Sequence, residues 1–149
     1  MEIKKSSAAL VRAIIESSVD VNIYLINGVK LSGKLISADQ DKLTLTKAGV
    51  GDVVYRDDMQ VIYRNAISTI EPQSQIHSSF FTEESSDEDE GEDLIDVLIR
   101  EKVPAKLYLK SGICLLGTIQ YEFADMFLLK TTKELQAVMK QAIATVTSN

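Results

Sequence analysis

The chain has 149 residues, a net charge of −6 and a single cysteine, and 45% of its residues are hydrophobic. One cysteine excludes an intrachain disulfide framework and is typical of a reducing compartment. No apolar stretch approaches the length of a signal-peptide core or a membrane span, so we expect a cytoplasmic protein without a membrane segment.

The excess of negative charge lies in one segment. Residues 1–72 contain 9 basic and 9 acidic side chains, residues 73–99 contain 0 and 9, and residues 100–149 contain 7 and 4. Residues 73–92 are rich in serine and acid, a composition that favours a flexible acidic linker. Because the run DEDEGED has glutamate where a calcium-binding loop needs its sixth-position glycine, we expect no metal site there.

The first residues predict a helix and then a hairpin. Ser6 or Ser7 can cap a helix through about residue 16, in which apolar residues recur at helical spacing. Apolar and polar residues then alternate from position 21, as in a strand, until Asn27-Gly28, a strong hairpin signal. Residues 6–28 are therefore expected to form a helix, a strand and a tight turn.

Four further strands are expected in the first half, at about 29–37, 42–46, 60–63 and 67–70. Gly33, within the second strand, indicates a bend or a close approach of two backbones. Residues 47–59 carry an insertion that is expected to lengthen a hairpin. Residues 1–72 thus predict a helix followed by five short strands.

The second half repeats this pattern. Tyr24, Gly28 and Gly33 correspond to Tyr108, Gly112 and Gly117, and each pair is separated by 84 positions. The segment YRNAIST at 63–69 corresponds to MKQAIAT at 139–145, at a separation of 76. Two matching segments with one change of length indicate a duplicated unit.

The elements of the second half follow from the same signals. Asp93 can cap a helix that ends before Pro104. Strands are expected at about 105–110, 113–121, 126–131, 135–140 and 143–147. Residues 93–149 therefore predict a second helix followed by five strands.

This pattern resembles the Sm-like fold, and specifically the family of the bacterial RNA chaperone Hfq. The segments that carry the resemblance are VNIYLINGVKLSGKLISADQ and QVIYRNAIST in the first half and LIREKVPAKLYLKSGICLLG and MKQAIATV in the second. The resemblance implies a mainly β fold class with two tandem Sm-like units, residues 1–72 and 93–149. Each unit is expected to be an N-terminal helix followed by a five-stranded, strongly bent small barrel.

The resemblance also implies an assembly. In the family, the fourth strand of one subunit pairs with the fifth strand of the next, and six units close a ring. With two units per chain, we expect a homo-oligomer of three chains that forms a pseudo-hexameric ring.

Single-stranded RNA, A-rich in sequence, is the partner that the resemblance implies. On the face of the ring called distal, tyrosines stack adenines and glutamines read the base edge. The corresponding residues here are Tyr24, Gly28, Val29, Lys30, Leu31, Gln60, Thr69, Tyr108, Gly112, Ile113, Leu115, Gln136 and Thr145. The alternative is that both tyrosines make only cross-strand contacts.

The opposite face, called proximal, binds uridines in the family, but its pattern is broken here. The corresponding residues are Gln40, Arg64, Asn65, Lys140 and Gln141. Asp41 and Asp125 stand where an aromatic ring is expected, and a carboxylate repels the RNA backbone. The arginine patch that the family carries on its rim is reduced to Arg100 and Lys102.

No pattern of catalytic residues is found. His77, the only histidine, lies in the linker, and Cys114 is expected within a strand, so we expect no enzyme and no cofactor. The sequence predicts an Hfq-like RNA chaperone and post-transcriptional regulator that holds A-rich RNA on a ring. The competing hypothesis is an Sm-like ring scaffold for protein partners that has lost RNA binding, which the acidic balance favours.

Overall fold

A computed structural model describes residues 6–47, 59–73, 93–132 and 134–148. The predicted hairpin insertion and the predicted acidic linker lie outside these ranges, apart from their end residues. None of the helices in the described ranges combines the length and apolar character that crossing a bilayer requires.

The first half contains one helix and five strands, as predicted. They are α1 (Ala8–Ser17), β1 (Asp20–Leu25), β2 (Lys30–Ala38), β3 (Lys42–Lys47), β4 (Met59–Tyr63), the 3-10 helix η2 (Arg64–Ala66) and β5 (Ile67–Pro72). The second half has the same order: α2 (Leu94–Glu101), β6 (Ala105–Leu109), β7 (Cys114–Glu122), β8 (Met126–Lys130), β9 (Leu135–Met139), η4 (Lys140–Ala142) and β10 (Ile143–Ser148). The chain is therefore mainly β, with a helix before each set of strands.

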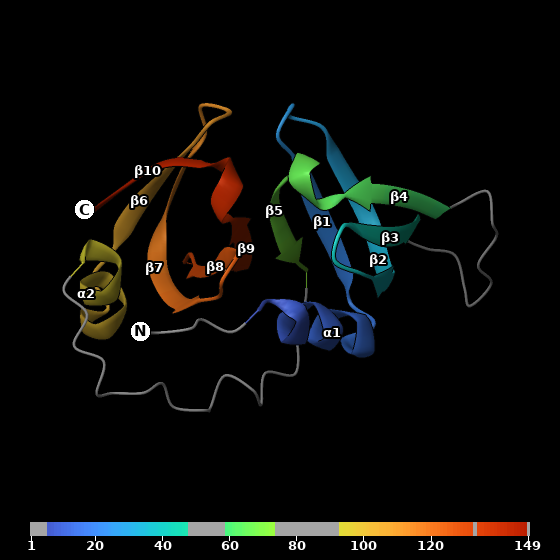
Figure 1. Ribbon diagram of the computed structural model, residues 1–149, viewed down its shortest axis with the longest axis horizontal. Helices are drawn as coiled ribbons and strands as arrows, with labels where there is room; N and C mark the ends of the chain where they lie inside the picture. The colour runs from blue at the N-terminus through green and yellow to red at the C-terminus, as the bar shows by residue number, and fades with distance from the viewer. Residues whose placement is uncertain (1–5, 48–58, 74–92, 133, 149) are drawn as a thin grey trace.

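All ten described strands join in one antiparallel sheet. Their order is β10-β6-β7-β8-β9-β5-β1-β2-β3-β4. The two halves meet where β5 pairs with β9, with Thr69 opposite Val138 and Ile70 opposite Ala137. Figure 1 shows β5 and β9 facing each other in the middle of the molecule. The two outer strands of the sheet are β4 and β10.

Glycines at two kinds of position shape each half of the sheet. Gly28 and Gly112 have φ of +95° and +97°, the conformation that each hairpin turn needs. A Cβ on Gly33 would lie 1.8 Å from the carbonyl oxygen of Thr46, and one on Gly117 would lie 2.5 Å from that of Lys130. The predicted close approach of two backbones at Gly33 is thus confirmed.

The helix caps differ between the two halves. Asp93 caps α2 as predicted, because its carboxylate accepts a hydrogen bond of 2.9 Å from the Asp96 backbone N–H. The predicted cap of α1 is divided between the two serines: Ser7 is the N-cap residue, but its side chain makes no cap hydrogen bond. The Ser6 hydroxyl accepts a bond of 3.0 Å from the Ala8 N–H instead. Ser7 is thereby left to contact the second half of the chain.

The apolar core extends across the junction between the halves. One cluster of buried residues joins α1 and β1–β5 with Phe123, Met126, Leu128, Met139 and Ala142 of the second half. A second cluster, around Leu98 of α2 and Leu107 of β6, belongs to the second half alone. Because apolar burial is the main stabilising contribution to folding, this shared cluster holds β9 against β5.

Candidate nucleic-acid interface

The predicted base-stacking residue Tyr24 lies at the junction of the two halves. It stands opposite Lys30 on β2 and Thr69 on β5, so these three side chains share one face of the sheet. The Lys30 ammonium lies 5.9 Å from the centre of the Tyr24 ring. The Tyr24 hydroxyl donates a hydrogen bond of 3.3 Å to Glu71. We call Asn22, Tyr24, Lys30, Thr69, Glu71 and Gln136 the junction cluster.

Glu71 is the centre of the junction cluster. Its carboxylate is buried, at 7% exposure, and accepts hydrogen bonds from the Asn22 amide at 3.1 Å and the Gln136 amide at 3.4 Å, besides that from Tyr24. Burial alone would raise the pKa of Glu71, but hydrogen bonds with Glu134, Asn22, Tyr24 and Gln136 outweigh burial and lower it. Burial and the neighbouring Glu71 charge raise the pKa of Tyr24.

The structure places the two predicted glutamines differently from each other. Gln136 on β9 reaches Glu71 across the junction and so belongs to the same cluster as Tyr24. Gln60, the counterpart of Gln136 in the first half, is exposed on the outer strand β4. Tyr24 therefore shares the partner Glu71 with the glutamine of the other half of the chain.

The remaining predicted residues near Tyr24 fall into two groups. Gly28 and Val29 lie in the β1–β2 turn, where Val29 is 45% exposed. Leu31 stands opposite the fully buried Ile23 and packs against the core, on the side of the sheet away from Tyr24. Leu31 therefore stabilises β2 by packing on the core side of the sheet.

The second tyrosine, Tyr108, lies in a more open setting. It stands opposite Cys114 on β7 and Thr145 on β10, and is 40% exposed because β10 is an outer strand. Gly112 and Ile113 lie in the β6–β7 turn, and Leu115, opposite the buried Leu107, packs against the core. We call Lys106, Tyr108, Cys114, Thr145 and Thr147 the edge cluster.

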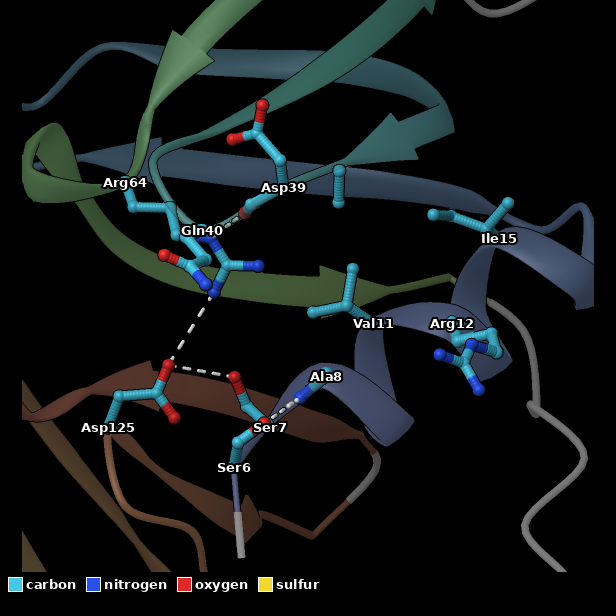
Figure 2. A pocket seen from close by; sticks show the side chains of 11 residues that line it. Ser6, Ser7, Ala8, Val11, Arg12, Ile15, Asp39, Gln40, Arg64 and Asp125 are labelled. Atoms are coloured by element: carbon cyan, nitrogen blue, oxygen red, sulfur yellow. Dashed lines mark hydrogen bonds and ion pairs between the residues drawn. The ribbon is translucent and has the colours of Figure 1, made fainter.

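A cavity of about 400 Å³ lies on the side of the molecule that carries α1 (Figure 2). Its lining residues come from α1 and the two residues before it, the end of β2 and the β2–β3 turn, η2 and the β7–β8 turn: Ser6, Ser7, Ala8, Val11, Arg12, Ile15, Ala38, Asp39, Gln40, Arg64 and Asp125. It contains Gln40 and Arg64, two of the residues predicted for the proximal face. The cavity therefore brings proximal-type residues of the first half against Asp125 of the second half.

Asp125 interacts with two polar side chains that line this cavity, Arg64 and Ser7. One of its carboxylate oxygens lies 3.5 Å from the Arg64 guanidinium and accepts a hydrogen bond of 2.8 Å from the Ser7 hydroxyl (Figure 2). Arg64 also donates from Nε to the Asp39 carbonyl oxygen at 2.9 Å. Hydrogen bonds from Lys42 and from two backbone N–H groups hold the pKa of Asp39 at about 2. Arg64 is thus neutralised from within the protein.

The other predicted proximal residues are arranged in a similar way. Lys140 pairs with Glu122 at 2.6 Å, and its ammonium lies 5.2 Å from the centre of the Phe127 ring. The Gln141 amide donates to the Arg64 carbonyl oxygen at 2.8 Å, which links η4 to η2, while Gln40 and Asn65 are exposed. Both predicted phosphate ligands of this face therefore already have carboxylate partners.

The predicted rim residues lie on and just after α2. Arg100 is exposed and lies 3.7 Å from the neighbouring Glu101 carboxylate, a weak surface pair. Lys102 ends the helix in the left-handed conformation and is exposed. These two cations are accessible but do not form an extended patch.

Three residues of this interface were not identified from the sequence. Glu71 and Ser7 act through contacts with residues distant in sequence, and Asp125 was noted only as a substitution. One signal for Glu71 was available: the separation of 76 that matches Thr69 to Thr145 places Glu71 opposite Thr147 in the alignment of the halves. The carboxylate of Glu71 and the hydroxyl of Thr147 at equivalent positions indicate that the two halves differ in role at this position.

These features define a mainly β domain with an N-terminal helix and a strand-rich sheet, consistent with the Sm-like fold. The family model of the Hfq protein matches residues 9–77. The match covers α1 and β1–β5 and includes the junction cluster residues Asn22 to Glu71. It supports the resemblance to the Hfq and Sm-like family over the first half of the chain.

Proposed function

We propose that the protein is an Hfq-like RNA-binding protein, a chaperone and post-transcriptional regulator, that assembles into a ring and holds A-rich single-stranded RNA on the face that carries Tyr24 and Tyr108. We also propose that residues 1–72 and 93–149 are two tandem Sm-like units, each a small bent barrel, joined by an acidic linker. The family match over residues 9–77 supports the class of function.

The observation that carries this proposal is the pairing of β5 with β9. It joins the fifth strand of the first half to the fourth strand of the second half. The outer strands of the sheet are β4, the fourth strand of the first half, and β10, the fifth strand of the second half. The β4 edge of one chain can therefore pair with the β10 edge of the next chain, as β9 pairs with β5 within the chain. Such a contact between chains is heterologous, because two different edges meet. Heterologous contacts form a closed ring when the rotation from one chain to the next brings the last chain back to the first.

The burial of equivalent residues supports this assembly. By the separation of 76, Val61 on β4 corresponds to Ala137 on β9. Ala137 is 1% exposed because β5 covers it, whereas Val61 is 53% exposed on the outer strand. An exposed strand edge with apolar side chains is a site for pairing with another chain. Three chains with two units each would complete a six-unit ring.

RNA binding is supported by the position of the tyrosines. Each lies on the face of the sheet opposite the core, beside a threonine of the fifth strand. A base stacked on an aromatic ring contributes about 1–3 kcal/mol and requires no particular sequence. The Gln136 amide, which shares Glu71 with Tyr24, has the donor and acceptor that distinguish one base edge from another.

A scaffold for protein partners is the second candidate, and the proximal cavity favours it. Arg64, which lines the cavity, and Lys140, which does not, are the two predicted phosphate ligands of the proximal face, and both are paired with carboxylates. Pairing of these two cations weakens the electrostatic part of RNA binding on that face, where Arg12 of α1 is a further cation that lines the cavity.

Fluorescence anisotropy with labelled oligo(A), oligo(U) and a random RNA separates the two functions. The proposal predicts salt-sensitive binding that is tightest for oligo(A) and is lost in the double variant Tyr24→Ala, Tyr108→Ala. The matched control Tyr24→Phe, Tyr108→Phe keeps both rings and should keep most of the affinity. Absence of salt-sensitive binding to any of the three RNAs would contradict RNA binding and favour the scaffold.

A further inference from the structure

The two tyrosines are equivalent in sequence spacing but differ in their surroundings. The Tyr24 hydroxyl donates a hydrogen bond to the buried Glu71 carboxylate, which also accepts hydrogen bonds from the Asn22 and Gln136 amides. Asn22 in turn accepts hydrogen bonds from Ser32 at 2.7 Å and from Gln73 at 2.8 Å. Asn22, Tyr24 and Gln136 of the junction cluster are therefore already hydrogen-bonded to Glu71.

The sheet register identifies the counterpart of each group in the edge cluster. Asn22 stands opposite Glu71 and Ser32, whereas Lys106 stands opposite Thr147 and Leu116. The second half thus has a lysine in place of the asparagine and a hydroxyl in place of the carboxylate. Lys106 forms no ion pair with any residue in the described ranges of the chain.

These exchanges have opposite effects on a polyanion. An RNA base placed on Tyr24 must displace or approach the Glu71 carboxylate, which is ionised at neutral pH, and the repulsion of the adjoining phosphate offsets the attraction of Lys30. A base placed on Tyr108 meets the Lys106 ammonium, which has no ion-pair partner among the described residues and attracts phosphate with release of counterions. The two clusters therefore differ in charge as well as in the availability of hydrogen-bonding groups.

We propose that Glu71 closes the junction cluster to RNA, so that RNA is held by the edge clusters around Tyr108 and contacts only every second unit of the ring. This inference rests on the proposed function and specifies which of its sites are used. In it, Glu71 is a specificity-determining residue that ties Tyr24 and Gln136 into the contact between the two halves.

Cys114, the only cysteine of the chain, provides a direct probe of the edge cluster. It is exposed and stands opposite Tyr108, in the position that Lys30 holds opposite Tyr24. Alkylation of Cys114 by iodoacetamide is measured on the unsubstituted protein with and without oligo(A). At about ten times the dissociation constant, mass action predicts about tenfold slower alkylation.

The matched probe of the junction cluster is the double variant Lys30→Cys, Cys114→Ser. Oligo(A) should leave its alkylation rate unchanged, and adding Glu71→Gln should make the introduced cysteine RNA-protected. In anisotropy, Tyr108→Ala should weaken oligo(A) binding by about fivefold or more, the smaller end of base stacking, with little effect of Tyr24→Ala.

The outcomes distinguish this inference from the proposed function. If oligo(A) binds and protects both cysteine positions alike, or if Tyr24→Ala weakens binding as much as Tyr108→Ala, Glu71 does not close the junction cluster and RNA binding stands. If oligo(A) neither binds nor protects Cys114, the proposed function itself is wrong.

Discussion

Val61 lies on the outer strand β4, is 53% exposed, and corresponds to Ala137, which is 1% exposed in the internal junction. If β4 of one chain pairs with β10 of the next as β9 pairs with β5, Val61 becomes buried opposite Val146 of the neighbouring chain. We predict that Val61→Lys prevents assembly because it places an ammonium group at that contact.

The magnitude follows from the burial. Full burial of a valine side chain is favourable by about 1.5–3 kcal/mol, so the exposed half of Val61 would contribute about 1 kcal/mol at each contact between chains. Burying an unpaired ammonium costs several kcal/mol, partly relieved because the lysine can extend towards water. A net loss of about 3 kcal/mol at each contact weakens it by about 150-fold.

Light scattering coupled to size-exclusion chromatography, over a range of protein concentrations, measures this loss. The control Val29→Lys introduces the same charge at a residue that is 45% exposed in the β1–β2 turn, away from both sheet edges. Adding Val146→Glu to Val61→Lys should restore assembly through an opposite-charge pair. Unchanged assembly of Val61→Lys, or equal disruption by the control, would refute the pairing of β4 with β10.

Three further predictions concern stability and the proximal cavity. Gly33→Ala should lower the free energy of unfolding, measured in urea, by about 3 kcal/mol or more, because its Cβ would overlap a backbone oxygen at 1.8 Å. The control Gly28→Ala, which has open space around it, should lower it by about 1 kcal/mol. Equal losses would contradict the close approach at Gly33. Asp125→Asn should raise oligo(U) affinity in anisotropy by up to about fivefold, because it frees Arg64; unchanged affinity would show that Arg64 does not meet RNA. Because the folded-state pKa of Glu71 lies below its ordinary 4.5, its stabilising effect is present above that pH and is lost as the pH falls through the folded-state value. Unfolding curves at decreasing pH should show a smaller loss of stability for Glu71→Gln than for the unsubstituted chain, and parallel losses would contradict this role.

Features that depend on neighbouring residues could be predicted from the sequence. The strand boundaries follow from alternation, the α2 cap from Asp93, and the turn from Asn27-Gly28, where the Asn27 side chain accepts a hydrogen bond of 3.1 Å from the Val29 N–H. A glycine within a strand, as at position 33, indicates a bend or a close approach of two backbones, and the structure has the close approach. These signals are local, so one sequence is enough to detect them.

Features that depend on the junction could not be predicted in the same way. The sequence around Ser7 predicts a helix cap, but the Ser7 hydroxyl donates its hydrogen bond to the carboxylate of Asp125, 118 positions away. Spacing identifies both Gln60 and Gln136 as candidate glutamines but does not say which of them lies near Tyr24, and the β5–β9 pairing brings Gln136 to Glu71, the hydrogen-bonding partner of Tyr24. Such partners are set by strand order, which propensity and spacing do not encode.

Native mass spectrometry of the full chain mixed with oligo(A) measures ring formation and RNA binding in one experiment. Three chains of 16.5 kDa give about 50 kDa, and we expect this mass together with a second peak that is heavier by one RNA. A single chain at all concentrations, or a three-chain ring that never carries RNA, would contradict this expectation.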